Sequence, residues 1–218
     1  MMNKSNNKSN NKSSKLWSRP EAKWRLGIPL GALLAFGLGA AALGTTNYVL
    51  HATSTTEFCY TCHSHENFIK PEYEASSHFM NNAGVRAECA DCHLPHDNWF
   101  DLVWTKAVVS LDIIPELAGK LETAEKYEAH RAEMAESVWR EFKENDSAFC
   151  RSCHSIDAMD LEEQDRQAAR RHSKAESRGE TCIDCHYGIV HVEPENAADI
   201  LERIDAEMNP NGDDQASD

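Results

Sequence analysis

One five-residue motif occurs four times in this chain: Cys59-Tyr-Thr-Cys62-His63, Cys89-Ala-Asp-Cys92-His93, Cys150-Arg-Ser-Cys153-His154 and Cys182-Ile-Asp-Cys185-His186. The four copies contain all eight cysteines of the sequence. C-x-x-C-H is the attachment motif of c-type haem, because its two thiols can bond to one porphyrin and the adjacent histidine can ligate the iron. We therefore predict four covalently bound haem c groups. The predicted attachment residues are Cys59, Cys62, Cys89, Cys92, Cys150, Cys153, Cys182 and Cys185, and the predicted proximal ligands are His63, His93, His154 and His186.

Structural zinc and disulfide bonds are the two other common uses of paired cysteines. Eight thiolates would suffice for two tetrahedral zinc sites, but zinc does not require a histidine after every second cysteine. A C-x-x-C loop suits a redox couple better than a structural disulfide. Four complete copies of the motif therefore favour haem over both alternatives.

The composition limits the fold. The chain has 218 residues, enough for one or two small domains, and 41% of them are hydrophobic, many in one N-terminal block. Because the remainder is poor in apolar residues, the haem groups must supply much of its core. We predict a mainly α-helical, haem-packed domain of two duplicated dihaem halves, with little or no sheet.

Charge is divided unevenly along the chain. The formal net charge is −14, yet residues 1–25 carry +6, which leaves −20 for the rest. An acidic surface argues against nucleic-acid binding. It suits a redox protein that docks transiently on a partner of complementary charge, and it equally suits a generic solubilising surface.

The N-terminal segment predicts a membrane anchor. Residues 1–25 begin with low-complexity Asn, Ser and Lys, and we expect them to be disordered and cytoplasmic. Residues 26–50 lack Asp, Glu, Lys and Arg and are long enough to cross about 30 Å of hydrocarbon as a helix. A cleaved signal peptide is the alternative, but its apolar region is usually only about 7–15 residues long. The basic flank places the following chain in the periplasm, so we predict a single-pass protein of the inner membrane of a Gram-negative bacterium.

The segment between the second and third motifs is predicted to be helical. Apolar residues recur at helical spacing from Leu102 to Leu111, and Pro115 should interrupt this helix. Residues 116–143 are charged on most faces and should form a largely solvated helix, and residues 157–178 another charged helical stretch. We assign residues 51–195 to the periplasmic haem domain. Residues 196–218 should be an acidic tail with a short helix at 197–208.

The motifs form two pairs, which indicates an internal duplication. The copies within the pairs start 30 and 32 residues apart, and each second copy has one histidine before it and another after it. These four histidines match in number the distal ligands that four bis-histidine haems require. The candidates are His78, His96, His172 and His191. Because His93 and His96 are too close to bind opposite faces of one haem, His96 would serve a different one.

The stretches from Gly84 to His96 and from Thr181 to His191, with the four motifs and the basic-flanked anchor, resemble the NapC/NirT family. That family comprises membrane-anchored tetrahaem cytochromes c that oxidise quinol and feed periplasmic reductases in anaerobic respiration. The resemblance implies menaquinol or ubiquinol as substrate, contact with membrane lipid, and a periplasmic reductase or soluble cytochrome as acceptor. A nitrate reductase-type acceptor is the first expectation.

The resemblance also implies roles for individual residues. His78 would serve the haem of His186, His191 that of His154, His172 that of His93, and His96 that of His63. Lys106 stands where some relatives use a lysine as the distal ligand of the second haem. His65 stands where relatives usually carry methionine, so it is an alternative ligand at the first haem. Asp112 is the leading candidate at the quinol site, with Lys106 and Glu57 as weaker ones.

Two other functions compete with quinol oxidation. One is a haem enzyme that reduces a small nitrogen oxide at an open iron site. The supply of two side-chain ligands to nearly every iron disfavours that hypothesis. The other is an electron-storage subunit without a quinol site.

Overall fold

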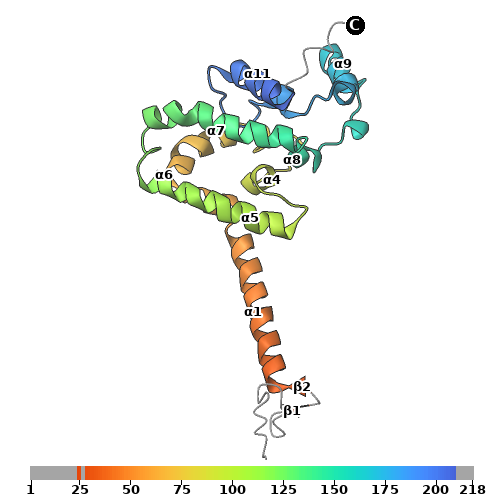
Figure 1. Cartoon of the computed structure of the whole chain (residues 1–218). Helices are drawn as coiled ribbons and strands as arrows, with labels where there is room; N and C mark the ends of the chain where they lie inside the picture. The colour runs from red at the N-terminus through yellow and green to blue at the C-terminus, as the bar shows by residue number, and fades with distance from the viewer. Residues whose placement is uncertain (1–23, 26–27, 210–218) are drawn as a thin grey trace, which may run out of the picture. The chain divides into compact units, whose positions relative to one another are not determined.

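The structure of this chain is a computed structural model that describes residues 24–25 and 28–209 (Figure 1). Residues 1–23 of the segment that we expect to be disordered lie outside these residues. Two short strands, β1 (Trp24–Arg25) and β2 (Ile28–Pro29), pair antiparallel. The prediction of a mainly α-helical chain with little sheet is confirmed. The helices are α1 (Leu30–Ala52), α2 (Thr56–Cys59), η2 (His65–Ile69), α3 (Lys70–Glu74), α4 (Cys89–His93), α5 (Trp99–Val109), η3 (Ser110–Asp112), α6 (Ile113–Leu117), α7 (Ala124–Glu144), α8 (Ala148–Arg151), η4 (Ile156–Ala158), α9 (Arg166–Ala175), η5 (Glu176–Arg178), α10 (Ile183–His186) and α11 (Ala197–Met208).

Helix α1 is the predicted anchor. Its 23 residues correspond to a length of about 34 Å, enough for the hydrocarbon core of a bilayer. Residues 31–52 are apolar enough to cross a membrane, and none of the most apolar window is buried by the rest of the chain. The amide of Asn47 donates to the Leu43 carbonyl at 2.9 Å, so this polar group is satisfied within the helix. The chain divides into two units, Met1–Val49 and Leu50–Asp218.

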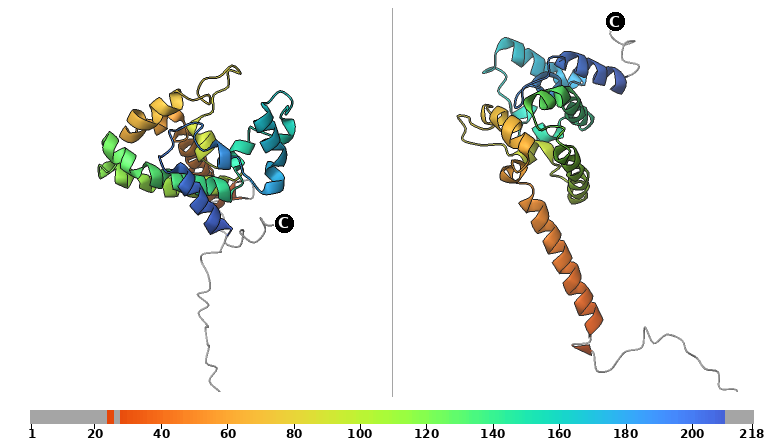
Figure 2. Two further views of the ribbon diagram at one scale, coloured as in Figure 1. Left: turned by 90° about the horizontal axis from the view of Figure 1, so that it is seen from above. Right: turned by 90° about the vertical axis from the view of Figure 1, so that its left-hand side faces the viewer.

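The core of the second unit is small. Helices α7 and α11 lie side by side (Figures 1 and 2) and pack around Trp139, Phe142, Ile200 and Ile204, with Ile183 of α10. Ile200 and Ile204 have no exposed surface. Most other large apolar side chains of the unit remain partly or fully exposed. A protein core this small accords with the expectation that haem supplies much of the apolar interior.

Two helices take a larger part in the core than the sequence predicts. Helix α7 is charged and largely exposed, but one of its faces buries Tyr127, Arg131, Trp139 and Phe142. The predicted acidic tail is also part of the core up to residue 208: α11 occupies the expected range and buries four side chains. Its i, i+3, i+4 spacing of apolar residues, from Ala197 to Ile204, was the signal for this packing.

Pro115 ends the predicted helix, as expected. Helix α5 stops at Val109, the 3-10 turn η3 follows, and Pro115 lies in the first turn of the new helix α6, where a backbone N–H would have no helical partner. A second break comes at Gly119, which has a φ of +67°. Lys120 N–H donates to the Pro115 carbonyl at 3.0 Å across this turn, which is the usual glycine-based end of a helix. The charged stretch 157–178 is helical only from Arg166 onwards, apart from the short η4 turn.

Candidate haem centre

Each C-x-x-C-H motif lies at or within a short helix. Helices α2 and α8 end in the first and third copies of the motif, and helices α4 and α10 contain most of the second and fourth copies. The two cysteines of a motif are three residues apart, so a helical turn places both thiols on one side. None of the eight cysteines forms a disulfide bond, so both thiols of every motif remain available for attachment to haem. Within residues 24–25 and 28–209, no three His, Cys, Asp or Glu side chains converge to hold a metal ion, as a zinc site would require.

The duplication is visible in the hydrogen bonds around the motifs. In the first copy Thr61 Oγ1 donates to the Phe58 carbonyl at 2.7 Å, and in the third Ser152 Oγ donates to the Phe149 carbonyl at 2.7 Å. The second and fourth copies each have an aspartate between the cysteines. Asp91 accepts from the Glu88 N–H at 2.7 Å, and Asp184 accepts from the Thr181 N–H at 2.6 Å. The two halves therefore share local structure as well as spacing.

In each half, the hydroxyl of the residue three positions before the first motif accepts a hydrogen bond from the backbone of the second motif. Thr56 Oγ1 accepts from the Cys89 N–H at 3.2 Å. Ser147 Oγ accepts from the Ile183 N–H at 3.2 Å, and Ser147 is fully buried. Because both hydroxyls tie consecutive motifs together, they fix the distance between the cofactors that the motifs would hold.

The motifs follow one another in space as they do in sequence. The thiols of Cys59 and Cys89 interact, as do those of Cys150 and Cys182. Between the two halves, Cys92 lies close to Cys150 and Cys153. The attachment residues therefore form one continuous series from the first motif to the fourth.

Three of the four motif histidines face a second histidine. The ring centroids are 6.2 Å apart for His78 and His154, 6.3 Å for His93 and His191, and 6.1 Å for His172 and His186. An imidazole nitrogen lies about 2 Å from a metal that it binds, so two rings on opposite sides of one metal have centroids about 6 Å apart. The three pairs therefore have the spacing that a bis-histidine haem iron requires.

This pairing differs from the one that the resemblance implied. His78 faces His154 rather than His186, His191 faces His93 rather than His154, and His172 faces His186 rather than His93. The second half thus supplies the ring opposite His93, and the first half supplies the ring opposite His154. In the fourth copy both rings come from the second half. Sequence spacing cannot distinguish these arrangements, because it shows which histidines flank a motif but not how the four motifs lie relative to one another.

The Nδ1 atoms of the three histidines outside the motifs, His78, His172 and His191, have different surroundings. His172 Nδ1 lies 2.7 Å from the Gln164 side-chain oxygen. His191 Nδ1 lies 3.6 Å from Glu72 Oε2 and makes no closer polar contact, and His78 Nδ1 is buried without a partner. A ligating histidine commonly presents its second N–H to a carboxylate or carbonyl oxygen, which fixes the tautomer. Gln164 and Glu72 are placed to do this, so the Nε2 atoms of His172 and His191 remain for iron.

The surroundings of the pairs favour the neutral imidazole that ligates a metal. Desolvation lowers the pKa of His93 to about 4 and also lowers the pKa of His78 and of His186. In each case the paired histidine is the second cause, because two neighbouring rings cannot both be charged without repulsion. The residues present therefore fit covalent haem with two imidazole ligands at three motifs.

The first motif is different. His63 Nε2 lies 3.1 Å from the Glu122 carbonyl and Nδ1 lies 3.1 Å from the Asn67 amide, so protein groups engage both nitrogens. His96 does not face His63. Its Nε2 lies 3.1 Å from the Asp91 carbonyl of α4, so this nitrogen is engaged by the second motif rather than facing the first. The expected role of His96 opposite His63 therefore finds no geometric support.

Of the two alternative ligands, His65 lies directly after the first motif as expected, whereas Lys106 lies beside the first motif rather than the second. His65 begins η2, and desolvation lowers its pKa, with further effects from Glu116 and His191. It thus lies between the first motif and the His93–His191 pair. Lys106 Nζ donates to the Thr53 carbonyl and lies 6.0 Å from the Phe58 ring centroid, beside the first motif. Because His191 already faces His93, Lys106 is not needed as a ligand there.

The acidic candidates lie near the first motif. Asp112 is exposed at the start of α6 and acts electrostatically on His65. Glu116, which sequence reasoning missed, accepts from the Ser64 N–H at 2.9 Å and so anchors the residue after His63. Its position four residues after Asp112 on a helical segment was the available signal. Glu57 is exposed in α2 and makes no contact that would link it to the other candidates.

Comparison with known proteins agrees with these features. The model of the NapC/NirT cytochrome c family, N-terminal region, matches residues 21–196. The chain is 51% identical over 164 residues to the cytochrome c-type protein TorY of Haemophilus influenzae, covering 75% of this chain and 44% of the relative. It is 43% identical over 208 residues to TorC of Escherichia coli, covering 91% of this chain and 52% of the relative.

Shorter relatives are matched along most of their length. The cytochrome c-type protein NapC of Escherichia coli is 39% identical over 183 residues, which are 83% of this chain and 88% of the relative. A putative tetrahaem cytochrome c-type protein of Allochromatium vinosum is 43% identical over 167 residues, 75% of this chain and 90% of the relative. This chain spans about half the length of the TorY and TorC relatives. No solved structure matches. From the four motifs and the match over residues 21–196, the chain belongs to the NapC/NirT cytochrome c family, and its haem is covalently bound haem c.

Proposed function

We propose that this protein is a single-pass inner-membrane cytochrome that oxidises membrane quinol and passes the electrons to a periplasmic acceptor, a nitrate reductase-type enzyme being the first candidate. Its four motifs would each hold one haem c group, and the three histidine pairs would ligate the iron at the second, third and fourth motifs. Its N-terminus is cytoplasmic, and residues 51–209 form the periplasmic haem domain. When bound, the haem groups supply one-electron redox chemistry.

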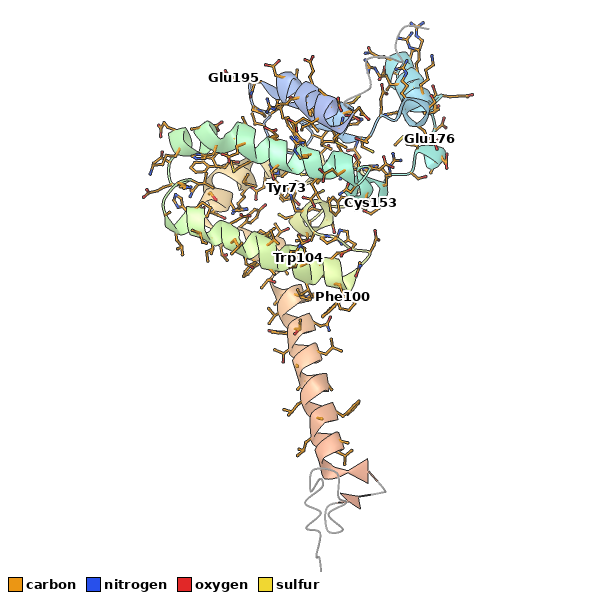
Figure 3. All side chains as sticks on the ribbon, viewed as in Figure 1. Tyr73, Phe100, Trp104, Cys153, Glu176 and Glu195 are labelled. Atoms are coloured by element: carbon orange, nitrogen blue, oxygen red, sulfur yellow. The ribbon has the colours of Figure 1, made fainter. Side chains whose placement is uncertain are left out.

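The observation that carries this proposal is an exposed apolar surface beside the first motif. No residue of α5, η3 or α6 is buried. The exposed large apolar side chains of this surface are Trp99, Phe100, Trp104, Val108, Val109, Leu111, Ile113, Ile114 and Leu117. Figure 3 shows Phe100 and Trp104 on α5, where they are 74% and 72% exposed. Patches of this kind are normally covered by lipid or protein.

Lipid is the occupant that the chain's connectivity favours. Lys106 of α5 donates to the carbonyl of Thr53, which directly follows Ala52, the last residue of α1. The apolar surface therefore starts where the chain leaves the anchor helix. Tryptophan is also enriched where proteins meet the membrane–water interface. A quinol dissolved in the bilayer would meet the first motif at this surface.

Quinol oxidation releases two protons, and these require acceptors with access to water. Asp112 is exposed and stands at the junction of η3 and α6, within electrostatic range of His65. Glu116 holds the Ser64 backbone and is half-buried. We assign proton acceptance to Asp112 and the positioning of the first motif to Glu116. Lys106 would hold α5 against the segment that leads into the first motif.

The test is reduction of the haem-loaded full-length protein, reconstituted in liposomes, by a menaquinol or ubiquinol analogue. We expect Asp112→Asn to slow this reduction by roughly 100-fold or more, the scale of losing a positioned proton acceptor. Asp101→Asn is the matched control, because Asp101 is an exposed carboxylate on the same segment, and it should leave the rate unchanged. Reduction by dithionite should be equal in all variants. Parent protein that dithionite reduces but the quinol analogue does not would contradict the proposal and favour an electron-storage subunit.

The first motif keeps a rival function open. In the part of the chain that the structure describes, no second imidazole faces His63 at the spacing of the other pairs. An iron with a free position there could reduce a small nitrogen oxide. Oxidation of the reduced protein by nitrite or hydroxylamine, at a rate comparable to quinol-driven reduction, would support this rival.

A further inference from the structure

Helix α9 presents a cationic surface on an acidic protein. Its four basic residues Arg166, Arg170, Arg171 and Lys174 are exposed, and Arg178 follows in η5. At 100° per residue they occupy one half of the helix circumference. The whole chain carries −14, so this local charge is opposite in sign to the net charge.

The cations on α9 are not neutralised by ion pairs within the described residues. Arg178 has one partner, Glu180 at 3.5 Å, whereas the four basic residues of α9 have none. Acidic residues 157–165 precede the helix, and Asp165 caps it by accepting from the Gln167 and Ala168 N–H groups at 2.9 and 3.0 Å. Within the described residues, none of these carboxylates forms an ion pair of 4.0 Å or less with a basic side chain of α9. The charges are therefore directed to solvent.

The opposite face of α9 belongs to the fourth motif. His172 is half-buried and stacks against His186 at 6.1 Å, and Ala168, Ala169 and Ala175 are half-buried on the same side. A single helix thus separates the cationic surface from the last histidine pair of the series. Within the second unit, α9 and α5 lie at opposite ends (Figures 1 and 2), so this surface is remote from the apolar one.

We propose that the cationic face of α9 is the docking surface for the electron acceptor, and that the acceptor presents an acidic patch to it. Electrons would leave from the fourth motif, the end of the series remote from the first. This inference rests on one part of the proposed function, the transfer of electrons to an external acceptor. It does not depend on quinol as the electron donor. The charge is complementary to a carboxylate-rich protein surface, and complementary charge raises encounter rates by roughly 10- to 1000-fold. Anionic lipid is disfavoured by the separation of α9 from the apolar surface.

The sign of the salt dependence tests this directly. The haem-loaded full-length protein is first reduced with dithionite, so quinol plays no part, and is then oxidised by ferricyanide in a stopped-flow instrument. Each event transfers one electron to ferricyanide, which becomes ferrocyanide, and no proton moves. A net charge of −14 alone would repel this anion, so its rate would rise with ionic strength. A cationic exit surface predicts the reverse, a rate that falls with ionic strength.

Two charge-matched variants separate the local charge from the net charge. Arg170→Gln/Arg171→Gln and Lys120→Gln/Lys126→Gln each remove two exposed positive charges, the second pair far from α9 in sequence. We expect the α9 double variant to be oxidised by ferricyanide roughly fivefold more slowly at low ionic strength, and the control to change much less. Oxidation by cationic hexaammineruthenium should not slow in either variant. Arg166→Gln/Lys174→Gln repeats the test should the first α9 variant load haem poorly.

A macromolecular probe addresses the partner's chemistry. Polyglutamate offers closely spaced carboxylates, as an acidic protein patch would, and should slow ferricyanide oxidation of the parent but not of the α9 double variant. Equal rates for the α9 and control variants, or a ferricyanide rate that rises with salt in the parent, would overturn the proposal. So would inhibition by polyglutamate that is the same in parent and variant.

Discussion

Glu72 on α3 connects the first half of the chain to the segment that carries His191, and we predict that Glu72→Gln destabilises the protein. Its carboxylate lies 2.6 and 3.2 Å from the Arg131 guanidinium and accepts from the Val192 N–H at 3.0 Å. The side chains of Glu72 and Arg131 are only 13% and 9% exposed. Arg131 also pairs with Glu128, whose side chain is 58% exposed. The two glutamates therefore allow a buried and an exposed partner of the same arginine to be compared.

The magnitude follows from this difference in burial. Breaking a buried ion pair by removing one partner costs about 3–5 kcal/mol. Glutamine retains the size of the side chain and one acceptor, and Arg131 keeps Glu128, so we expect about 2–3 kcal/mol for Glu72→Gln. Glu128→Gln should cost less than about 1 kcal/mol, because water and salt screen an exposed pair. For a domain of this size the Glu72 variant should melt roughly 4–12 °C below the parent.

The assay is thermal unfolding of the haem-loaded protein in detergent, followed by far-ultraviolet circular dichroism, with Glu128→Gln as the control. The absorption spectrum of the folded variant provides a second readout, since a displaced His191 should add a high-spin component. The reasoning is refuted by a Glu128→Gln variant that loses as much stability as Glu72→Gln, or by a Glu72→Gln variant that melts with the parent.

Three further predictions concern the histidine pairs and the core. His191→Ala should give one haem an open position that binds carbon monoxide, whereas His130→Ala should not, because His130 only contacts the Lys126 carbonyl of its own helix at 2.8 Å; identical spectra for the two would count against the pairing. Ile204→Ala should lower the free energy of unfolding by about 2–4 kcal/mol, and exposed Met208→Ala by less than about 0.5 kcal/mol, measured with urea. Burial raises the pKa of Tyr127 to about 12, so the folded state holds this proton more tightly than the unfolded state, whose value is about 10. Stability should therefore fall as pH rises above about 10, and Tyr127→Phe should reduce that slope; an unchanged slope would contradict it.

Much of the fold could be predicted because it depends on neighbouring residues. The anchor follows from an uncharged apolar run, and α11 follows from apolar residues at helical spacing. The burial of α7 was missed because Tyr127, Trp139 and Phe142 are scattered among many charges, and their common face appears only once α11 covers it. The end of α5 ahead of Pro115 could also be predicted, because proline is excluded from a helix interior but tolerated in the first turn of the next helix.

The sequence by itself predicts where haem attaches, because two thiols and a histidine within five residues are a local chemical requirement. It also predicts the apolar N-terminal helix and the internal duplication, and it identifies the NapC/NirT family. Only the tertiary structure decided which histidines face one another, because the pairings depend on how the four motifs are packed together. It likewise decided the contacts of Glu72, which joins Arg131 and Val192 although they lie 59 and 120 residues further along the chain. Burial and proximity of residues far apart in the chain set such contacts, and no short stretch of sequence encodes them.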